Sequence, residues 1–508
     1  MTNPWIIVPV AVPAMTAAFL VLALRHSLTG QRVVSVAATF FQLAVAIGLY
    51  ALASDGELRI YLLGNWPAPF GIVLVLDRLA SIMLLLTGLL ASGIVLAALG
   101  EWDKRGRHFH ALFQFQLLGV NGAFLTGDLF NLFVFFEVLL IASYGLMLHG
   151  GGARRLKAGF HYIGINLIGS TVFLFAAGLI YAATGTLNMA DLAAKVPLVT
   201  EANQPLLAAG ALLLLTVFAT KSAMVPLHWW LPTAYGSTSP PVAAMFAIMT
   251  KVGAYSLIRV YTLIFGAEAG PLADIAATWL LPAGTVTLVL GTIGVLAARR
   301  IVDLVCYSLI ASMGTVLIAI GLTGEAALAA AMYYALQSTI ASAALFLLAG
   351  LLAPEKNSRV TFASLPQYAT LFAGFYFLLA IATVGLPPLA GFIGKLLILD
   401  AGRAASSAIV VWSTILISSL LLTIGFVRTG MQMFWNSSPA AAGEPPQHAV
   451  PLGPVAVIAG MIAAIAVLSL FAGAVMDDLT AMAEQLRAPQ RYIAAVLRAQ
   501  VTMNLTGE

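Results

Sequence analysis

Long apolar stretches separated by short polar segments make up most of this chain of 508 residues. Each stretch runs for about 20 residues, the length that a helix needs to cross a ~30 Å hydrocarbon layer. The stretches are solidly apolar rather than alternating, and unpaired backbone groups are costly in lipid, so an open β architecture and a barrel are both excluded. We therefore predict an all-α polytopic membrane protein with about fourteen transmembrane helices. The spans are expected to begin near Pro4, Val33, Val73, Ala111, Leu129, Phe160, Leu206, Val242, Ala276, Val302, Leu328, Ala369, Ser407 and Pro451.

The charges of the loops test this span count, because cytoplasmic loops hold an excess of Lys and Arg. Basic residues gather in alternate loops. One set of loops holds Arg25, Arg32, Lys104, Arg105, Arg107, Arg154, Arg155, Lys157, Arg299, Arg300, Lys356, Arg359 and Arg428. The other set holds Arg59, Arg78, Lys195 and Arg403 together with Asp55, Glu57, Asp191, Glu201, Glu268, Asp274 and Glu325. This alternation predicts an even number of spans, with both termini outside.

The composition fits a membrane protein and excludes several kinds of function. Hydrophobic residues make up 61% of the chain and charged residues 9%, whereas roughly a quarter of residues are charged in soluble proteins. The net charge of +4 is spread over short loops, which disfavours nucleic-acid binding. Cys306 is the single cysteine and the seven histidines are scattered, so we expect no disulfide and no metal site. We find no phosphate loop or nucleotide fingerprint, and we expect no cofactor.

Three ionisable residues stand out within the predicted spans, where a charge costs at least a few kcal/mol. Lys251 lies about ten residues into its span, which at 1.5 Å per residue is ~15 Å deep. Glu137 lies nine residues past Asp128 at a similar depth, and it is the only acidic residue that we place deep. Lys221 ends a long apolar run just before Pro226.

Burial disfavours the charged form of such groups, and a nearby opposite charge restores it. We therefore predict that these groups load and release protons near neutral pH, and that an ion pair between Glu137 and Lys221 acts as a gate. The alternative is a static buried ion pair that fixes helix packing. The surplus of buried positive charge, which a static pair does not explain, favours the proton path.

A fourth candidate, Lys395, follows the break GLPPLAGFIGK. Pro387 and Pro388 remove backbone donors and interrupt the helix. Such a break is tolerated inside a span where the freed backbone lines a cavity, as in transporter binding sites. We place Lys395 toward the outer end of its span, as the exit of the path. The alternative is a lysine that snorkels from a helix end.

Other polar residues on the spans could connect these sites through water: His161, Ser222, Tyr255, Arg259, Gln337 and Ser338. Most of them are expected to form interhelical hydrogen bonds, and we keep Gln337 and Ser338 as a possible relay. His228 is a candidate for proton uptake because the unperturbed pKa of histidine is near neutral. Its neighbours Trp229 and Trp230 are explained equally well by an interfacial aromatic belt.

The last part of the chain differs from the spans. From Asp477 to about Asn504 it carries Arg487, Arg491 and Arg498 among apolar residues. This pattern predicts an amphipathic helix on the membrane surface or against a partner, with a solvated tail as the alternative. The segment from Asn436 to Gln447, rich in Ser, Pro and Ala, is expected to be a cytoplasmic loop.

Nearly the whole chain resembles the antiporter-like subunits of the complex I superfamily. The resemblance is carried by KSAMVPLHWWLPTAYGSTSPPVAAMFAIMTKVGAYSLIRVY, with FEVLLIASYGLM before it and GLPPLAGFIGK after it. Within that superfamily, YLLGNWPAPFGIVLVLDRL, WLPTAYGS and the chain length resemble the D subunits of the Mrp (Mnh or Pha) multisubunit sodium/proton antiporters. Respiratory members usually have a histidine where this loop has Tyr235. Members often have a histidine or lysine near Gln337, Ser338 and Ser342, so water would have to fill this part of a relay.

The resemblance implies a fold and a set of site residues. The family's glutamate on helix 5 matches Glu137, and its lysines on helices 7, 8 and 12 match Lys221, Lys251 and Lys395. The implied fold has fourteen helices with two inverted five-helix repeats, in which helix 7 is broken near Pro226 and helix 12 near Pro387 and Pro388. The implied regions are residues 1–110 (helices 1–3), 111–262 (helices 4–8, first repeat), 263–433 (helices 9–13, second repeat) and 434–508 (helix 14 and the amphipathic segment).

The resemblance also implies a function. We expect a proton-translocating subunit of a monovalent cation (Na⁺ or K⁺)/proton antiporter in the bacterial inner membrane, rather than an enzyme. The expected partners are other Mrp subunits of types A, B, C, E, F and G. One alternative is a proton-pumping subunit of a redox complex, such as an NADH-quinone oxidoreductase or a membrane-bound hydrogenase. A second is a scaffold whose lysines are inert.

Overall fold

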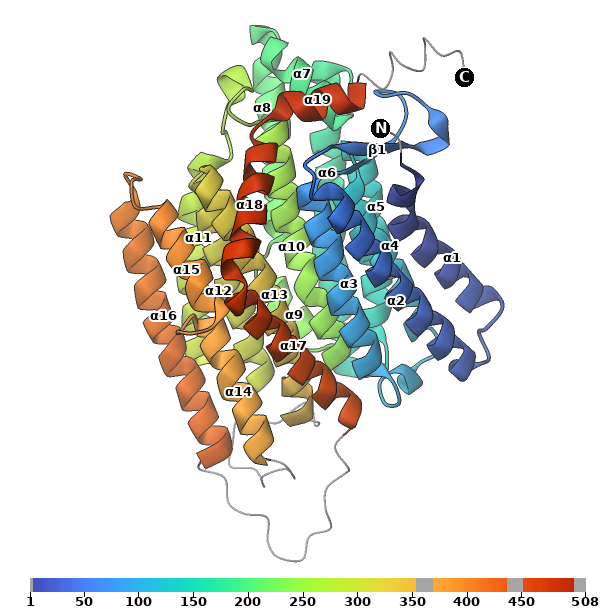
Figure 1. Cartoon of the computed structure of the whole chain (residues 1–508), viewed down its shortest axis with the longest axis vertical. Coiled ribbons are helices and arrows are strands. Elements are labelled where there is room, and N and C mark those ends of the chain that lie inside the picture. The colour runs from blue at the N-terminus through green and yellow to red at the C-terminus, as the bar shows by residue number, and fades with distance from the viewer. Residues whose placement is uncertain (1–2, 353–368, 436–450, 498–508) are drawn as a thin grey trace, which may run out of the picture.

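A computed structural model describes residues 3–352, 369–435 and 451–497 of the chain. Most of them form long helices that lie side by side in one bundle (Figure 1). Twelve helices of the described residues are long and apolar enough to cross a membrane. They are α1 (Val8–Leu22, which a 3₁₀ turn, Pro4–Ile7, extends), α2 (Leu28–Ala53), α3 (Arg78–Ala98), α5 (Leu129–Leu148), α6 (Ala153–Thr184), α8 (Gln204–Lys221), α10 (Pro240–Leu263), α11 (Ala277–Ala297), α12 (Ile301–Gly321), α13 (Glu325–Leu352), α16 (Ala408–Gly430) and α17 (Leu452–Leu470).

Two further crossings are shorter or interrupted. Helix α4 (Phe109–Leu125) has 17 residues, and α14 (Ala369–Val384) is followed after a break by α15 (Ala390–Ala401). Together with the twelve long helices they account for the fourteen crossings predicted from hydropathy. The all-α membrane fold is thereby confirmed.

The described chain starts and ends at the same end of the bundle (Figure 1). The Asn3 amide donates a hydrogen bond to the Ile60 carbonyl (3.0 Å), and helix α19 (Pro489–Leu497) packs on the strand that contains Ile60. An even number of crossings requires this arrangement.

A small β-hairpin at this end departs from the predicted helices. Strand β1 (Arg59–Leu62) pairs antiparallel with β2 (Val73–Leu76), so the span expected to begin near Val73 begins instead at Arg78. All four residues of β2 are buried, and a strand covered on both faces reads as a continuous apolar run that merges with the following helix. Asp77 sets the boundary, because its side chain caps α3 by accepting a hydrogen bond from the Ala80 amide (2.8 Å).

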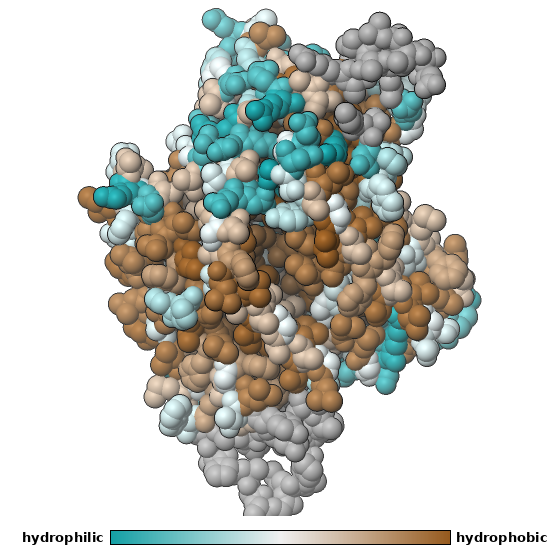
Figure 2. All heavy atoms as spheres, viewed as in Figure 1, coloured by the Kyte–Doolittle hydropathy of each residue, from teal (hydrophilic) through white to brown (hydrophobic). Residues whose placement is uncertain are grey.

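Helix α10 occupies the centre of the molecule. Its most apolar window is fully buried, and it packs against α3, α8 and α13. Helix α13 in turn packs against both α10 and α15. The outer helices show their apolar side chains around the middle of the bundle, while hydrophilic residues gather at its upper end (Figure 2). Side chains on α10 and on the inner face of α13 are therefore shielded from lipid.

Two helices are interrupted where the prolines predict it. Helix α8 ends at Lys221, and the short helix α9 (Trp230–Tyr235) follows after a non-helical segment that contains Pro226. Helix α14 ends at Val384, and Gly385 adopts a left-handed conformation (φ +83°) that ends a helix readily without a Cβ. Pro387 and Pro388 lie in the gap before α15, so both predicted broken helices are confirmed.

The C-terminal segment packs on its own chain. Helix α18 (Ala472–Leu486) follows α17, and α19 crosses the end of the bundle (Figure 1). Leu479, Met482 and Leu486 are buried, and α18 packs on α13 while α19 packs on α7 (Met189–Lys195). The predicted amphipathic character is confirmed, but the apolar face is covered by the chain itself.

Some expectations concern residues outside the described part of the chain. They are the loop charges Lys356 and Arg359, the cytoplasmic loop from Asn436 to Gln447, and the end of the amphipathic segment with Arg498.

Candidate functional site

Lys221 lies at the end of α8, where the helix breaks. Its side chain is 8% exposed, and its Nζ donates a hydrogen bond to Asn166 Oδ1 on α6 (2.7 Å). No carboxylate of the described residues lies within 4 Å of this nitrogen. The predicted direct ion pair between Glu137 and Lys221 is therefore wrong, because the amide of Asn166 takes the place of the carboxylate.

Glu137 lies on α5 and is connected to Lys221 through α6. Its Oε1 accepts a hydrogen bond from Ser170 Oγ, and the same hydroxyl group lies 3.0 Å from the Asn166 carbonyl. Asn166 and Ser170 are one helical turn apart, so α6 supplies a polar bridge between the two candidates. Glu137 is only partly buried. Val134 and Ile141, which lie about one turn before and after it on the same face of α5, are 39% and 64% exposed.

Lys251 lies at the middle of α10, as predicted. It is 1% exposed, and its Nζ has no hydrogen-bond partner among the described residues. Two residues further along, Gly253 contacts the broken segment so closely that a Cβ there would lie 2.5 Å from Ser222 Oγ. The Ser222 hydroxyl is also buried without a described partner. Polar groups buried in this way need water as a hydrogen-bond partner.

Lys395 lies on α15 but reaches back to the break. Its Nζ donates hydrogen bonds to the Val384 carbonyl (2.7 Å) and to Ser419 Oγ (2.8 Å). Val384 is the last residue of α14, so the ammonium lies at the negative end of that helix dipole. The side chain is 5% exposed, which excludes the snorkelling alternative.

The proposed relay residues lie on α13, between α10 and α15. Gln337 Nε2 donates to the carbonyl of Ala382 (2.8 Å), which lies in the last turn of α14. Its Oε1 is buried without a described partner. Ser338 Oγ contacts its own helix at the Ala335 carbonyl (3.2 Å). Gln337 therefore reaches the break next to Lys395, while a role for Ser338 stays a prediction.

The aromatic residues beside His228 differ in their surroundings. Trp230 is 4% exposed and its Nε1 donates to the Thr220 carbonyl (3.1 Å), which satisfies a backbone group near the end of α8. Trp229 is 51% exposed, so an interfacial belt explains Trp229 alone. His228 is partly buried in the connection between α8 and α9, and its role in proton uptake stays a prediction.

A buried ion pair that the sequence did not indicate lies near the C-terminal end of α10. Arg259 Nη1 and Nη2 donate to the two carboxylate oxygens of Asp77 (2.6 and 2.8 Å). Their side chains are 3% and 2% exposed. Arg259, listed among the polar residues of the spans, thus makes its contact with another helix, at the residue that caps α3. Asp77 escapes a hydropathy reading because it directly follows the apolar run of β2; an Asp at the capping position before a helix is the signal that could have found it.

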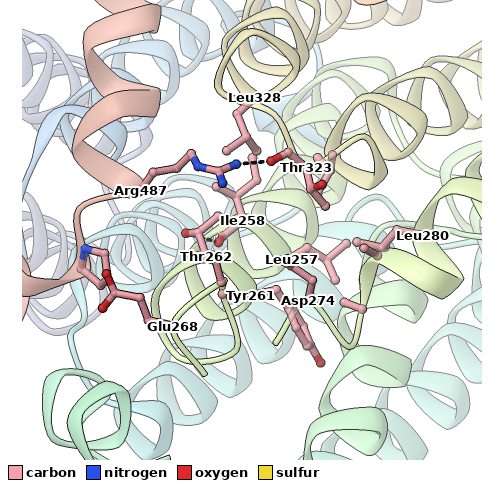
Figure 3. Close-up of a pocket in the computed structure, with 16 residues that line it drawn as sticks. Leu257, Ile258, Tyr261, Thr262, Glu268, Asp274, Leu280, Thr323, Leu328 and Arg487 are labelled. Atoms are coloured by element: carbon pink, nitrogen blue, oxygen red, sulfur yellow. Dashed lines mark hydrogen bonds between the residues drawn. The ribbon is translucent and has the colours of Figure 1, made fainter. Parts of the chain in front are cut away.

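A second polar region lies farther along α10. A cavity of about 100 Å³ is lined by Ile258 and Thr262 of α10 and by Glu268 and Asp274 of the following loop. Arg487 reaches across from the end of α18 and donates to the Thr323 carbonyl (Figure 3). The C-terminal segment thus closes the end of the bundle above α10.

Comparison with known proteins places this geometry in a family. The family described as "NADH:quinone oxidoreductase/Mrp antiporter, TM" matches residues 126–426, which include all four candidate charges. A protein of Rhizobium meliloti, named as the D subunit of a probable K(+)/H(+) antiporter, is 40% identical, and the match covers 97% of each chain. A Bacillus subtilis protein, named as the D subunit of a Na(+)/H(+) antiporter, is 34% identical over 98% of this chain and 100% of its own length.

Solved structures show the same fold. A chain of the Mrp complex from Dietzia sp. superimposes with a TM-score of 0.88 at 28% identity, over 97% of this chain and 99% of that one. A chain of respiratory complex I from Thermus thermophilus superimposes with a TM-score of 0.78 at 22% identity, over 95% and 99%. The chain belongs to the transmembrane family shared by NADH:quinone oxidoreductases and Mrp antiporters, and within it to the antiporter D subunits.

Proposed function

We propose that this chain is a proton-translocating subunit of a multisubunit monovalent cation (Na⁺ or K⁺)/proton antiporter. The observation that carries the proposal is Lys251, a lysine buried at the centre of the bundle without a described partner. An ionisable residue in such a place is expensive and by default marks an ion path. The names of the relatives from Rhizobium meliloti and Bacillus subtilis support the choice of a cation/proton antiporter.

The proposed path has an order. Glu137 acts on Lys221 through Asn166 and Ser170 on α6, and Lys221 exchanges protons with Lys251 across the break beside Ser222. Water beside Gln337 connects Lys251 to Lys395. Lys395 then releases protons toward the outer side, and His228 takes part in their uptake.

The proposed orientation rests on charge. The loops rich in Lys and Arg would lie in the cytoplasm of a bacterial cell and both termini outside, because basic loops remain on the cytoplasmic side. The two broken helices occupy equivalent places in residues 111–262 and 263–433, which supports two inverted repeats in those regions. The partners would be the other Mrp subunits, since the relatives are named as subunits of assemblies.

A direct test uses vesicles that contain the complete purified assembly. Adding Na⁺ or K⁺ on one side should move protons across the membrane, detected with a pH-sensitive dye, in the absence of any electron donor. Vesicles without the assembly are the control. If protons move only when an electron donor and acceptor are present, the antiporter proposal fails.

That outcome would favour the second candidate, a pumping subunit of a redox complex. The observation behind it is fold likeness: a chain of an archaeal respiratory complex, the membrane-bound sulfane sulfur reductase, superimposes with a TM-score of 0.85 at 26% identity. The fold alone serves both functions, so the assay must decide between them.

Removing the charge of Glu137 should have an intermediate effect. Glu137→Gln keeps an oxygen that can accept the Ser170 hydrogen bond, so helix packing is preserved. Because its electrostatic effect on Lys221 is indirect, we expect roughly tenfold slower cation-driven proton movement, equivalent to about 1.4 kcal/mol. The exposed Glu325→Gln is the matched control. An unchanged rate in Glu137→Gln would remove Glu137 from the path.

A further inference from the structure

A cavity of about 570 Å³ opens between α6, α9 and α12, at the end of the bundle with the basic loops. Arg154 and Lys157 at the start of α6 and Arg300 just before α12 bring three positive charges to its lining. Asp303 is the one acidic residue among the described residues of the lining, and it is already paired with Arg300 (Nε to Oδ2, 2.7 Å). The described residues that line the cavity therefore carry a net positive formal charge.

The start of α6 adds to this preference for anions. Its N-cap residue is Gly152, which has no side chain to accept hydrogen bonds from the first amides of the helix. The N–H groups of a first helical turn and the helix dipole attract negative charge. Lys157 is exposed on the first turns of α6, where it can contact a bound anion. The ligand class that fits is a phosphate group.

The surface beside the cavity is apolar and faces outward. Leu156 and Phe160 on α6 are 65% and 79% exposed, and Trp229 at the rim is 51% exposed. Leu156 is adjacent to Lys157 in the chain, so the basic and apolar surfaces are continuous. A free phosphate ion uses only the charged part of this surface, whereas a phospholipid uses both parts. Basic pockets between membrane helices are known to bind anionic headgroups.

We propose that this cavity binds the headgroup of an anionic phospholipid, whose acyl chains lie along the exposed residues of α6. Trp229 and Trp230 lie at the start of α9 and line the cavity. A bound lipid would therefore contact the short helix that follows the break after Lys221. The site is independent of the proposed transport function.

The proposal can be tested with brominated lipids, which quench tryptophan fluorescence on contact. The complete assembly is reconstituted in phosphatidylcholine containing either brominated phosphatidylglycerol or brominated phosphatidylcholine. We expect brominated phosphatidylglycerol to quench a component of the fluorescence that is absent in the variant Trp229→Phe. In Arg154→Gln/Lys157→Gln its apparent affinity should fall about tenfold or more, because two basic residues near a lipid surface are lost.

The control Lys104→Gln/Arg107→Gln removes the same charge from exposed residues at the same end and should leave the affinity unchanged. Millimolar inorganic phosphate separates the two sources of phosphate: if it abolishes the quenching, the site prefers the free ion and the lipid proposal fails. Equal quenching by the two brominated lipids, or no component attributable to Trp229, also overturns it. Arg154→Lys/Lys157→Arg should retain the affinity, which distinguishes loss of charge from misfolding.

Discussion

Lys251→Met should reduce cation-driven proton movement by at least ~100-fold, the low end of what a positioned proton-transfer group contributes. At the same time the assembly should be as stable as wild type or more stable. The reason is that Lys251 is 1% exposed and its ammonium has no described partner. A lysine at the centre of a membrane helix is unfavourable by about 2.5–3.5 kcal/mol, and methionine of similar length removes that penalty.

The combination of lost transport and retained stability distinguishes a proton path from a scaffold. Proton movement is measured with a pH-sensitive dye in vesicles, and stability by thermal unfolding of the same preparation. The control is Lys195→Met, because Lys195 forms a partly exposed ion pair with Asp191 (2.8 Å) at the end of the bundle, away from the proposed path. Full transport in Lys251→Met would contradict the proposed path and leave the scaffold alternative.

The candidate lysines could be predicted because each conflicts with its surroundings in the sequence. A lysine within an apolar span must face the protein interior or water, so Lys221 and Lys251 were expected to be buried, and Lys395 was expected to be the exit of the path. The two helix breaks could be predicted from the prolines near Lys221 and Lys395. Proline removes a backbone hydrogen-bond donor, and lipid cannot supply a replacement. Both signals lie in short stretches of sequence, so a single sequence is enough to detect them.

The partners of these lysines could not be predicted, because they come from distant segments. Asn166 contacts Lys221 although the two residues are 55 positions apart in the chain. An asparagine on a membrane helix usually forms a hydrogen bond to another helix, but the sequence does not show which residue is its partner. Lys395 was expected near the outer surface from its position on the helix. Its side chain instead reaches back to Val384, since the free carbonyls at the end of α14 attract a cation.

The burial of two segments was misread for a shared reason. Val73–Leu76 forms a strand instead of the start of a span, and the amphipathic segment predicted from Asp477 packs on its own chain instead of on the membrane surface or a partner. Burial within the protein and burial in lipid select the same side chains, so hydropathy cannot tell them apart. The position of Asp77 is the signal that would have separated the strand from the helix, because an Asp directly before an apolar helix caps its start.

The ion pair between Asp77 and Arg259 yields the largest expected effect on stability. Asp77→Ala leaves the guanidinium of Arg259 buried without its partner, which should destabilise the protein by about 3–5 kcal/mol. Arg259→Met should have a similar cost, because it leaves the carboxylate buried. The double variant Asp77→Ala/Arg259→Met removes both charges and should be more stable than either single variant.

The double variant should not return fully to wild type, because Asp77 also caps α3 through the Ala80 amide, and loss of such a cap costs about 1 kcal/mol. Unfolding of the purified chain in detergent, followed by tryptophan fluorescence, measures all three variants. Glu101→Ala, which removes an exposed ion pair with Arg105, is the control and should change little. Additive destabilisation in the double variant would mean that the two side chains act independently.

Because Arg259 also lies 5.6 Å from the Tyr492 ring of α19, the single variants should also loosen the C-terminal segment, which limited proteolysis would detect as earlier cleavage.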